Sequence, residues 1–313
     1  MSTSRRIISG LVTATVLGTV AVVVHATPAH AATASTLCAV PAAVTGVQRY
    51  TLGAGTTWTT IRTASTRSVY GGGGYGVVAV NPTPHADAYL RRPGSTTWEK
   101  VAAPVGVASW SYKTTDTALY MWLGPSQTSN PVYRHNGSGI SWTDIGGPFR
   151  TMYAGNYGLF ATHPSTGNIY RYSGTGKSWA IVGGPGHSFG VTNTALYGLS
   201  PDSSGIWQYS GSGTSWFNIG GAAFTIAAGG HGLFATMKPS GDLFRYLGTP
   251  GSWEFMGTPN RAVHGSIRSV VVSNNAVFVE SSNTGQLWIW DPSDEGGWAT
   301  IGGGQVRSMA ACP

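Results

Sequence analysis

The sequence predicts an all-β fold, a seven-bladed β-propeller made of four-stranded antiparallel blades. Two observations carry this prediction: tryptophans recur at a nearly regular interval, and each opens a block of short apolar stretches separated by glycine-rich turns. A period in this range is typical of repeat architectures, in which each repeat packs against its neighbours. The tryptophans that open the blocks are Trp58, Trp98, Trp142, Trp179, Trp216, Trp253 and Trp298.

The block that begins at Trp142 shows the expected strands. Residues 142–145 form the first strand, 149–154 the second, 159–162 the third and 169–172 the fourth. Glycine and proline mark the turns between them, because glycine accepts a positive φ and proline cannot donate to a strand ladder. Four short strands joined by such turns form an antiparallel meander.

The strands are apolar on both faces. Trp142 and Ile145 lie three positions apart, so their side chains point to opposite faces of the first strand. A sheet of this kind must be covered on both sides. Blades that pack between two neighbours around a ring meet this demand, whereas a two-sheet sandwich would leave one face of each sheet in water.

The two ends of the chain are expected to close the ring. Six complete intervals separate the seven tryptophans, and the remainder makes a seventh blade. Residues 298–301 and 305–311 match the first two strands of a block, while residues 37–40 and 46–50 match the last two. The N- and C-terminal strands would therefore share one blade, two strands from each end.

The two cysteines test this closure. Superposing the blocks carries Cys312 onto Asn156 and Cys38 onto Phe160, which flank one hairpin loop. Two such positions approach within disulfide range, so a Cys38–Cys312 bond is predicted. The cysteines are 312 − 38 = 274 positions apart, for which the chain-entropy treatment gives an upper limit of about 5–6 kcal/mol of stabilisation.

The N-terminus is typical of a secretory signal, predicted for residues 1–31. Arg5 and Arg6 precede an apolar run, and Ala29-His30-Ala31 offers small residues for cleavage. A single propeller domain, residues 32–313, would remain, secreted and monomeric, with no membrane span in the mature form. An exported chain also favours the disulfide.

Charge excludes one class of partner. Removing residues 1–31 takes away two arginines and no acids, which leaves a net charge of 16 − 11 = +5. The positive residues are scattered along the sequence, whereas a nucleic-acid binder concentrates them on one face. No nucleic-acid partner is expected.

The blocks resemble tectonin repeats and the related tachylectin-type propeller lectins. The resemblance is carried by Trp-x-x-Ile-Gly-Gly, then Gly-Leu-Phe-Ala, then Thr-Gly-Asn-Ile-Tyr-Arg, and is strongest over residues 142–255. Tachylectins have fewer blades, so the predicted blade number departs from theirs. Membership would imply recognition of carbohydrates, often microbial surface glycans, at repeated sites on or between blades.

Two sets of repeated side chains are candidates for binding. Three hairpin loops between the second and third strands carry a ring before their last glycine: Tyr75, Tyr157 and His231. A sugar binds to an aromatic plate beside polar groups, although these rings could instead pack on a neighbouring loop. Fourth strands carry Arg134, Arg171 and Arg245. An arginine suits vicinal hydroxyls or carboxylates, or protects the outermost strand against edge pairing.

No catalytic or metal-binding motif is found, so an enzyme, a metal and a cofactor are not expected. The acids fall mostly in turns, and the cluster Asp291, Asp294 and Glu295 lies in an exposed-looking connection. The predicted function is multivalent binding of surface glycans by a secreted protein. The alternatives are an extracellular protein-binding scaffold or inhibitor and a carbohydrate-active enzyme.

Overall fold

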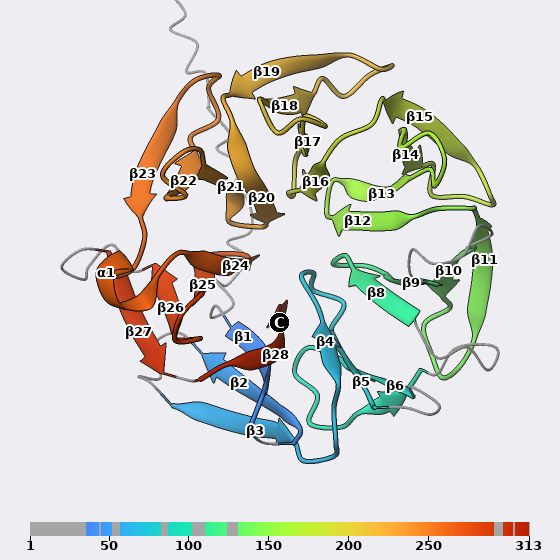
Figure 1. The fold of residues 1–313 in the computed structure, drawn as a ribbon. Helices are drawn as coiled ribbons and strands as arrows, with labels where there is room; N and C mark the ends of the chain where they lie inside the picture. The colour runs from blue at the N-terminus through green and yellow to red at the C-terminus, as the bar shows by residue number, and fades with distance from the viewer. Residues whose placement is uncertain are drawn as a thin grey trace, which may run out of the picture. The chain divides into compact units, whose positions relative to one another are not determined.

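Seven four-stranded antiparallel sheets follow one another around a ring in the computed structural model, which describes residues 36–43, 45–51, 57–82, 87–101, 110–123, 131–290, 297–302 and 304–312 (Figure 1). All of them lie in the unit Thr33–Pro313. The predicted signal segment, residues 1–31, and the boundary at residue 32 lie outside the described residues. The predicted all-β, seven-bladed propeller is confirmed.

Each blade has one strand at each of four concentric positions. The lists of strands that follow give one strand per blade, in the order of blades A to G. The innermost strands are β28 (Val306–Cys312), β4 (Ser68–Tyr70), β8 (Trp110–Thr114), β12 (Thr151–Gly155), β16 (Ser188–Val191), β20 (Ala223–Gly229) and β24 (Ile267–Val272). The second strands are β1 (Thr36–Pro41), β5 (Val77–Val80), β9 (Leu119–Leu123), β13 (Gly158–Thr162), β17 (Leu196–Leu199), β21 (Gly232–Met237) and β25 (Val277–Ser281).

The outer half of each blade holds the third and fourth strands. The third strands are β2 (Val47–Thr51), β6 (Ala88–Arg91), β10 (Val132–His135), β14 (Ile169–Tyr172), β18 (Ile206–Tyr209), β22 (Leu243–Tyr246) and β26 (Leu287–Trp290). The outermost strands are β3 (Trp58–Arg62), β7 (Glu99–Lys100), β11 (Trp142–Gly146), β15 (Trp179–Gly183), β19 (Trp216–Gly220), β23 (Trp253–Gly257) and β27 (Trp298–Gly302). A short helix, α1 (Arg261–His264), lies between β23 and β24.

The strand that carries the repeated tryptophan closes a blade and does not open one. In blade D, for example, the sheet order is β12, β13, β14 and β15, so Trp179 stands on the outermost strand. The prediction placed this strand first in its own block, which is wrong. A periodic sequence has no intrinsic starting point, and the glycine-rich turn after β15, for example, leads to β16, the innermost strand of the next blade.

The ring closes in blade A, where β28 from the C-terminus pairs with β1 from the N-terminus (Figure 1). Three strands of this blade come from the N-terminus and one from the C-terminus, so the expected division of two and two is corrected. The predicted disulfide is present, with the Cα atoms of Cys38 and Cys312 5.7 Å apart. Cys312 lies opposite Thr36, diagonally across from Cys38.

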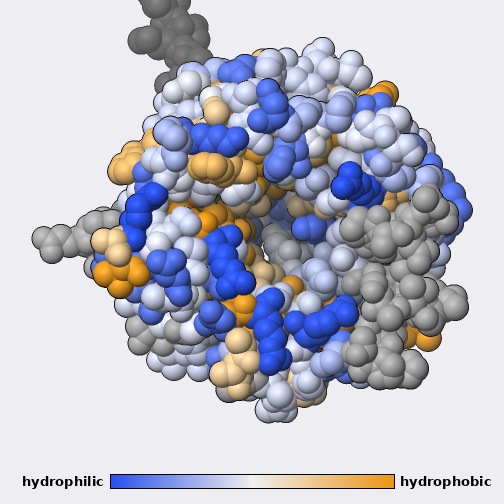
Figure 2. All heavy atoms as spheres, in the orientation of Figure 1, coloured by the Kyte–Doolittle hydropathy of each residue, from blue (hydrophilic) through white to orange (hydrophobic). Residues whose placement is uncertain are grey.

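The core consists of seven apolar layers, one at each junction between neighbouring blades of the described chain. The layer between blades C and D joins Tyr120 and Ile145 to Met152 and Leu159, with Trp179 packed against it. Neighbouring innermost strands contact each other around the whole ring. This is the burial of both sheet faces that the sequence predicts. Figure 2 shows the ring hollowed at its centre.

A circumferential set of hydrogen bonds joins the outermost strands. The indole Nε1 of a tryptophan donates to a backbone carbonyl of the preceding blade, with N–O distances of 2.7 to 2.9 Å. The pairs are Trp58 to Ile301, Trp98 to Ile61, Trp179 to Ile145, Trp216 to Val182, Trp253 to Ile219 and Trp298 to Met256. The pair Trp58–Ile301 spans the closure between blades A and G.

The repeated Ile-Gly-Gly motif accommodates these indoles. A Cβ atom on Gly183 would lie 2.6 Å from Nε1 of Trp216, and one on Gly220 would lie 2.9 Å from Nε1 of Trp253. The second glycine of each pair differs, because a Cβ on Gly184 or Gly221 would meet nothing within 4 Å. At Gly183 and Gly220 the first glycine therefore leaves room for the indole that the next blade supplies.

Gly183→Ala is expected to lower the free energy of unfolding by about 1–3 kcal/mol, because the new methyl group displaces the Trp216 indole from the Val182 carbonyl. The matched variant Gly184→Ala should change it by less than about 0.5 kcal/mol. Chemical denaturation followed by far-ultraviolet circular dichroism measures both. Equal stabilities of the two variants would contradict this role of the motif.

Candidate functional site

The connections of the blades divide between the two rims of the ring. On one rim, a turn that links two blades (residues 184–186) and a turn between second and third strands (residues 199–201) line the same cavity, which is called the blade E pocket below. The blade C pocket is lined by hairpin loops between the first and second strands and by connections that leave the third strands. This is the division that an antiparallel meander predicts, because successive connections alternate between its ends.

The hairpin loops between the innermost and second strands alternate in type. In blades B, D and F they carry the predicted ring residues, Tyr75, Tyr157 and His231. Each of these residues donates its backbone N–H to a carbonyl of the next blade, respectively Thr115 at 3.0 Å, Thr192 at 3.1 Å and Ser273 at 2.8 Å. The hydroxyls of Thr115, Thr192 and Ser273 in turn accept N–H bonds within their own loops. A hydrogen bond between the side chains of Asp116 and Asn156 also links the loops of blades C and D.

The side chains of the three ring residues pack against the protein itself. The Arg92 guanidinium lies 4.5 Å from the Tyr75 ring centre, and the Tyr75 hydroxyl is 3.1 Å from Nδ1 of His135. Tyr157 stacks on Phe160, and the Arg171 guanidinium lies 4.6 Å from its ring centre.

His231 has a similar environment in blade F. Its ring stacks on Phe234 with the ring centres 5.8 Å apart. Burial and, to a lesser extent, the nearby positive charge of Arg245 together lower the pKa of His231 to about 4. The His231 ring is therefore neutral at physiological pH.

The predicted arginines lie on third strands and not on the blade edge. The explanation that they protect an outermost strand is therefore wrong, because the tryptophan strand covers them. Arg171 also donates to the carbonyl oxygen of Tyr157 at 3.0 Å, and Arg245 lies 4.0 Å from the Glu254 carboxylate. Arg134 is exposed on β10.

Two of the predicted residues, Tyr75 and Arg134, share a cavity of about 550 Å³. Its other polar lining groups include Asn136 and Thr143, and Tyr172 adds a second aromatic ring. We call this cavity the blade C pocket. Its lining residues are Tyr75, Arg92, Thr117, Arg134, His135, Asn136, Gly137, Thr143, Ile145, Tyr172, Gly174 and Gly176.

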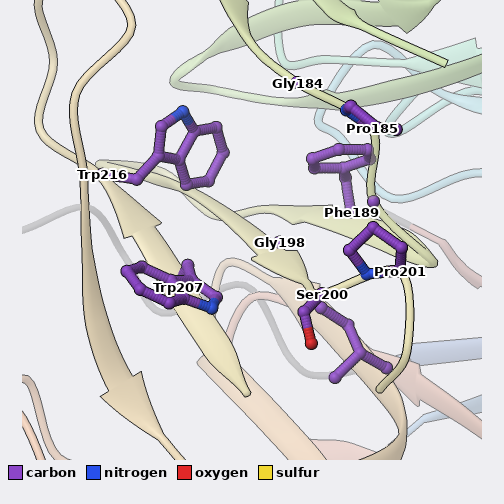
Figure 3. Close-up of a pocket in the computed structure, with 10 residues that line it drawn as sticks. Gly184, Pro185, Phe189, Gly198, Ser200, Pro201, Trp207 and Trp216 are labelled. Atoms are coloured by element: carbon purple, nitrogen blue, oxygen red, sulfur yellow. The ribbon is translucent and has the colours of Figure 1, made fainter. Parts of the chain in front are cut away.

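The opposite rim holds an aromatic cavity of about 310 Å³ that the sequence analysis missed. Figure 3 shows the rings of Trp207 and Trp216 on one side of it and Phe189, Pro185 and Pro201 on the other. We call this cavity the blade E pocket. Its lining residues are Gly184, Pro185, Gly186, Phe189, Gly198, Leu199, Ser200, Pro201, Trp207 and Trp216.

The blade E pocket occupies the place of a core side chain in the sister blade. In blade D, Phe149 is buried, with its ring centre 4.4 Å from that of Trp179 and 6.0 Å from that of Tyr170. Aligning the two blocks puts Gly186 at the position of Phe149. The tryptophans of the blade E pocket stand at the positions of Tyr170 and Trp179. The signals available in the sequence were this glycine and the larger rings of Phe189 and Trp207, which stand where blade D has Met152 and Tyr170.

Polar groups border the blade E pocket at the turn after β17. Ser200 lines the pocket, and its hydroxyl donates to the Asp202 carboxylate at 2.7 Å. The hydroxyls of Ser200 and Ser204 and the backbone N–H of Ser204 lower the pKa of Asp202 to about 2. An ionised acceptor therefore lies next to the aromatic walls. Trp207 is 38% exposed, so its ring is open to a ligand.

The central channel holds one further charge. A cavity of about 220 Å³ on the ring axis is lined by residues of all seven innermost strands, and Lys113 is the only charged group in its described lining. Burial lowers the pKa of Lys113. In the part of the chain that the structure covers, no group of three or more His, Cys, Asp or Glu side chains is arranged to hold a metal ion. The acids Asp291, Asp294 and Glu295 lie outside the described residues.

Comparisons with solved structures show the propeller fold. The chain is similar to AztD of Citrobacter koseri, with a TM-score of 0.52 and 9% identity over 89% of this chain and 97% of AztD. A prolyl endopeptidase matches with a TM-score of 0.50 and 13% identity over 68% of this chain and 39% of its own. YCF48 bound to a D1 peptide matches with a TM-score of 0.48 and 16% identity over 75% and 81% of the two chains.

No protein family matches the sequence, and no curated protein resembles it closely enough to count as a relative. The match to AztD supports the propeller fold alone, and the tectonin resemblance stays a prediction beyond that fold. No helix within the described ranges is long and apolar enough to cross a membrane.

The lowered pKa of His231 predicts a loss of stability at acidic pH. An ordinary histidine titrates near 6.5, so the unfolded chain takes up this proton before the folded protein does. This loss of stability is absent above about pH 6.5, grows as the pH falls, and is complete below about pH 4. An NMR titration of the His231 ring should give a midpoint near 4.

His231→Gln removes the titrating group and should flatten the pH dependence of the unfolding midpoint between about pH 4 and pH 6.5. A ring that titrates near 6.5 in the folded protein would contradict the burial described for His231.

Proposed function

We propose that the protein is a multivalent carbohydrate-binding propeller and that the blade E pocket is its principal site. One observation carries the proposal: blade E has Gly186 where blade D has the buried Phe149, and it holds a cavity walled by two tryptophans. Leaving such a cavity in a repeat costs packing energy. A bound ligand that fills it restores those contacts. The tectonin-like motifs of the sequence point in the same direction.

The chemistry of the blade E pocket suits a sugar ring. The exposed face of Trp207 offers a flat surface to the C–H groups of a pyranose. The Nε1 of Trp216 is used by the Val182 carbonyl, so this indole contributes its ring alone. At the turn beside them, the Asp202 carboxylate accepts hydrogen bonds from hydroxyls, and Ser200 both donates and accepts them.

The blade C pocket supports a second site on the same ring. It combines two tyrosine rings with an exposed arginine, an amide and a hydroxyl. Two weak sites on one rigid body give higher avidity on a glycan-coated surface than either gives alone. A secreted location fits this role and fits the disulfide, which requires an oxidising compartment.

The proposed activity is binding of a glycan without its hydrolysis. Glycoside hydrolysis generally uses two carboxylates that flank the scissile bond. No Asp or Glu is among the described lining residues of the blade C and blade E pockets. The proposed protein therefore retains a glycan and does not cleave it.

Copying blade D into blade E tests the principal site. Gly186→Phe combined with Phe189→Met places in blade E the side chains that blade D has as Phe149 and Met152, and the second change is needed because a Cβ on Gly186 would lie 2.7 Å from Phe189. The double variant should keep the fold and weaken saccharide binding about tenfold or more, since the stacking contacts are lost. A glycan array followed by calorimetry with the best methyl glycosides measures this.

The matched control is Phe217→Ala, because Phe217 is 39% exposed on the outermost strand of the same blade and does not line the pocket. It should bind saccharides as the native protein does. Absence of binding by the folded native protein at millimolar saccharide would overturn the proposed function.

A protein-binding scaffold is the second candidate, favoured by apolar side chains on the outermost strands of blades D, E and F. Ile181, Phe217 and Phe255 are 45%, 39% and 63% exposed, respectively. Exposed apolar surface of this kind is common at protein interfaces.

Pull-down from culture supernatant distinguishes the two candidates. On the scaffold hypothesis, Phe255→Asp should abolish capture of a partner, and the Gly186→Phe, Phe189→Met variant should not. Capture that survives Phe255→Asp would count against the scaffold surface.

A further inference from the structure

A third cavity, of about 240 Å³, lies at the junction of blades A and B and is lined by three arginines. Arg49 comes from β2, Arg91 from the end of β6, and Arg92 follows it. The half-cystines Cys38 and Cys312 also line it, and hydroxyl side chains are supplied by Ser95 and Thr96. No Asp or Glu is among its described lining residues. We call this cavity the arginine pocket.

Arg49 has no partner for its charge among the described residues. Its Nε atom is buried and makes no hydrogen bond, and no carboxylate lies within 4.0 Å of its guanidinium. An unpaired buried donor destabilises the folded protein, and the cost is greater when the donor is charged. Native proteins rarely keep such a group without a use for it.

Arg91 adds a second charge beside the first. Its Nε donates to the Ser95 carbonyl at 2.7 Å, which uses one of the five guanidinium donors. Burial lowers the pKa of Arg91, and repulsion from Arg49 lowers it further. Two guanidiniums thus share a partly buried space without a described counter-charge.

Two other arginines of the same strand position have partners within the protein. Arg171 lies against the rings of Tyr157 and Phe160, and Arg245 lies 4.0 Å from Glu254. Arg92, the third arginine of the pocket, is also satisfied: its Nε lies 3.8 Å from the Glu99 carboxylate and its Nη2 donates to the Gly137 carbonyl at 2.5 Å. Arg49 and Arg91 are the two arginines of this pocket without a described counter-charge.

We propose that Arg49 and Arg91 form a subsite for the acidic group of a glycan, a carboxylate or a sulfate. Guanidinium groups bind such oxyanions through paired, charge-assisted hydrogen bonds. Arg92 lines both the arginine pocket and the blade C pocket, so the two cavities adjoin. An oligosaccharide in the blade C pocket places a neighbouring uronic acid or sulfated sugar at Arg49 and Arg91. This inference rests on the proposed function and specifies its ligand class.

The test compares ligands that differ in one group. Calorimetry at low salt is run with methyl α-glucuronide, with methyl α-glucoside and with sodium sulfate on the native protein. The glucuronide is expected to bind about tenfold or more tightly than the glucoside, because one charge-assisted contact is worth at least the 1.4 kcal/mol that this ratio represents. Its affinity should fall as salt is added.

Variants locate the effect. Arg49→Gln and Arg91→Gln should each reduce the glucuronide affinity towards that of the glucoside. Arg150→Gln removes the same charge from an exposed position in blade D and should leave the preference intact. Arg49→Lys keeps the charge and loses the planar fork, so it should retain part of the preference and report on folding if the Gln variant is unstable. Thermal unfolding accompanies each titration.

The outcomes separate the subsite from the function. Glucuronide that binds no better than glucoside, or a preference that Arg150→Gln lowers as much as Arg91→Gln does, overturns the subsite, while neutral saccharides in the blade E pocket would still uphold the proposed function. Sulfate and glucuronide binding that depends on Arg91, with no array signal for any oligosaccharide, upholds an anion site and overturns the glycan function and the assignment to a glycan.

Discussion

The ring depends on one repeated contact, the hydrogen bond from a tryptophan indole to a backbone carbonyl of the preceding blade. Each such bond contributes on the order of 1 kcal/mol, and the rings of Tyr172 and Trp179, for example, add an aromatic contact across the third and outermost strands. The bond holds the outermost strands of adjacent blades together at the circumference of the ring. At Gly146 and Gly220, which follow Ile145 and Ile219, the indole also lies close to the place that a side chain would take.

Much of the fold is predictable from the sequence because repeated local signals agree. The strands expected at residues 159–162 and 169–172 match β13 and β14 closely, and the cysteines identify the closing blade. The starting point of the blade is not predictable in this way. The sequence between Trp142 and Trp179 is equally consistent with a unit cut before or after the tryptophan strand, and only the pairing of β14 with β15 decides.

The candidate sites are harder to predict because they depend on space between blades. Tyr157 and Arg171 were each predicted as ligand contacts, and the structure places them against each other. Repetition indicates that a residue matters to every blade, which is as true of a packing role as of a binding role. The blade E pocket arises from the opposite kind of signal, since Gly186 departs from the pattern that Phe149 sets.

The alternating hairpin loops have a consequence for the number of blades. Loops with a tyrosine or histidine in blades B, D and F contact loops with threonine or serine in blades C, E and G. Two alternating types cannot close on a ring of odd number without one interruption of the alternation. Blade A is that interruption, because its innermost and second strands are the two chain ends and no hairpin joins them. The disulfide between Cys38 and Cys312 thus joins the innermost and second strands of the one blade in which no hairpin loop joins them.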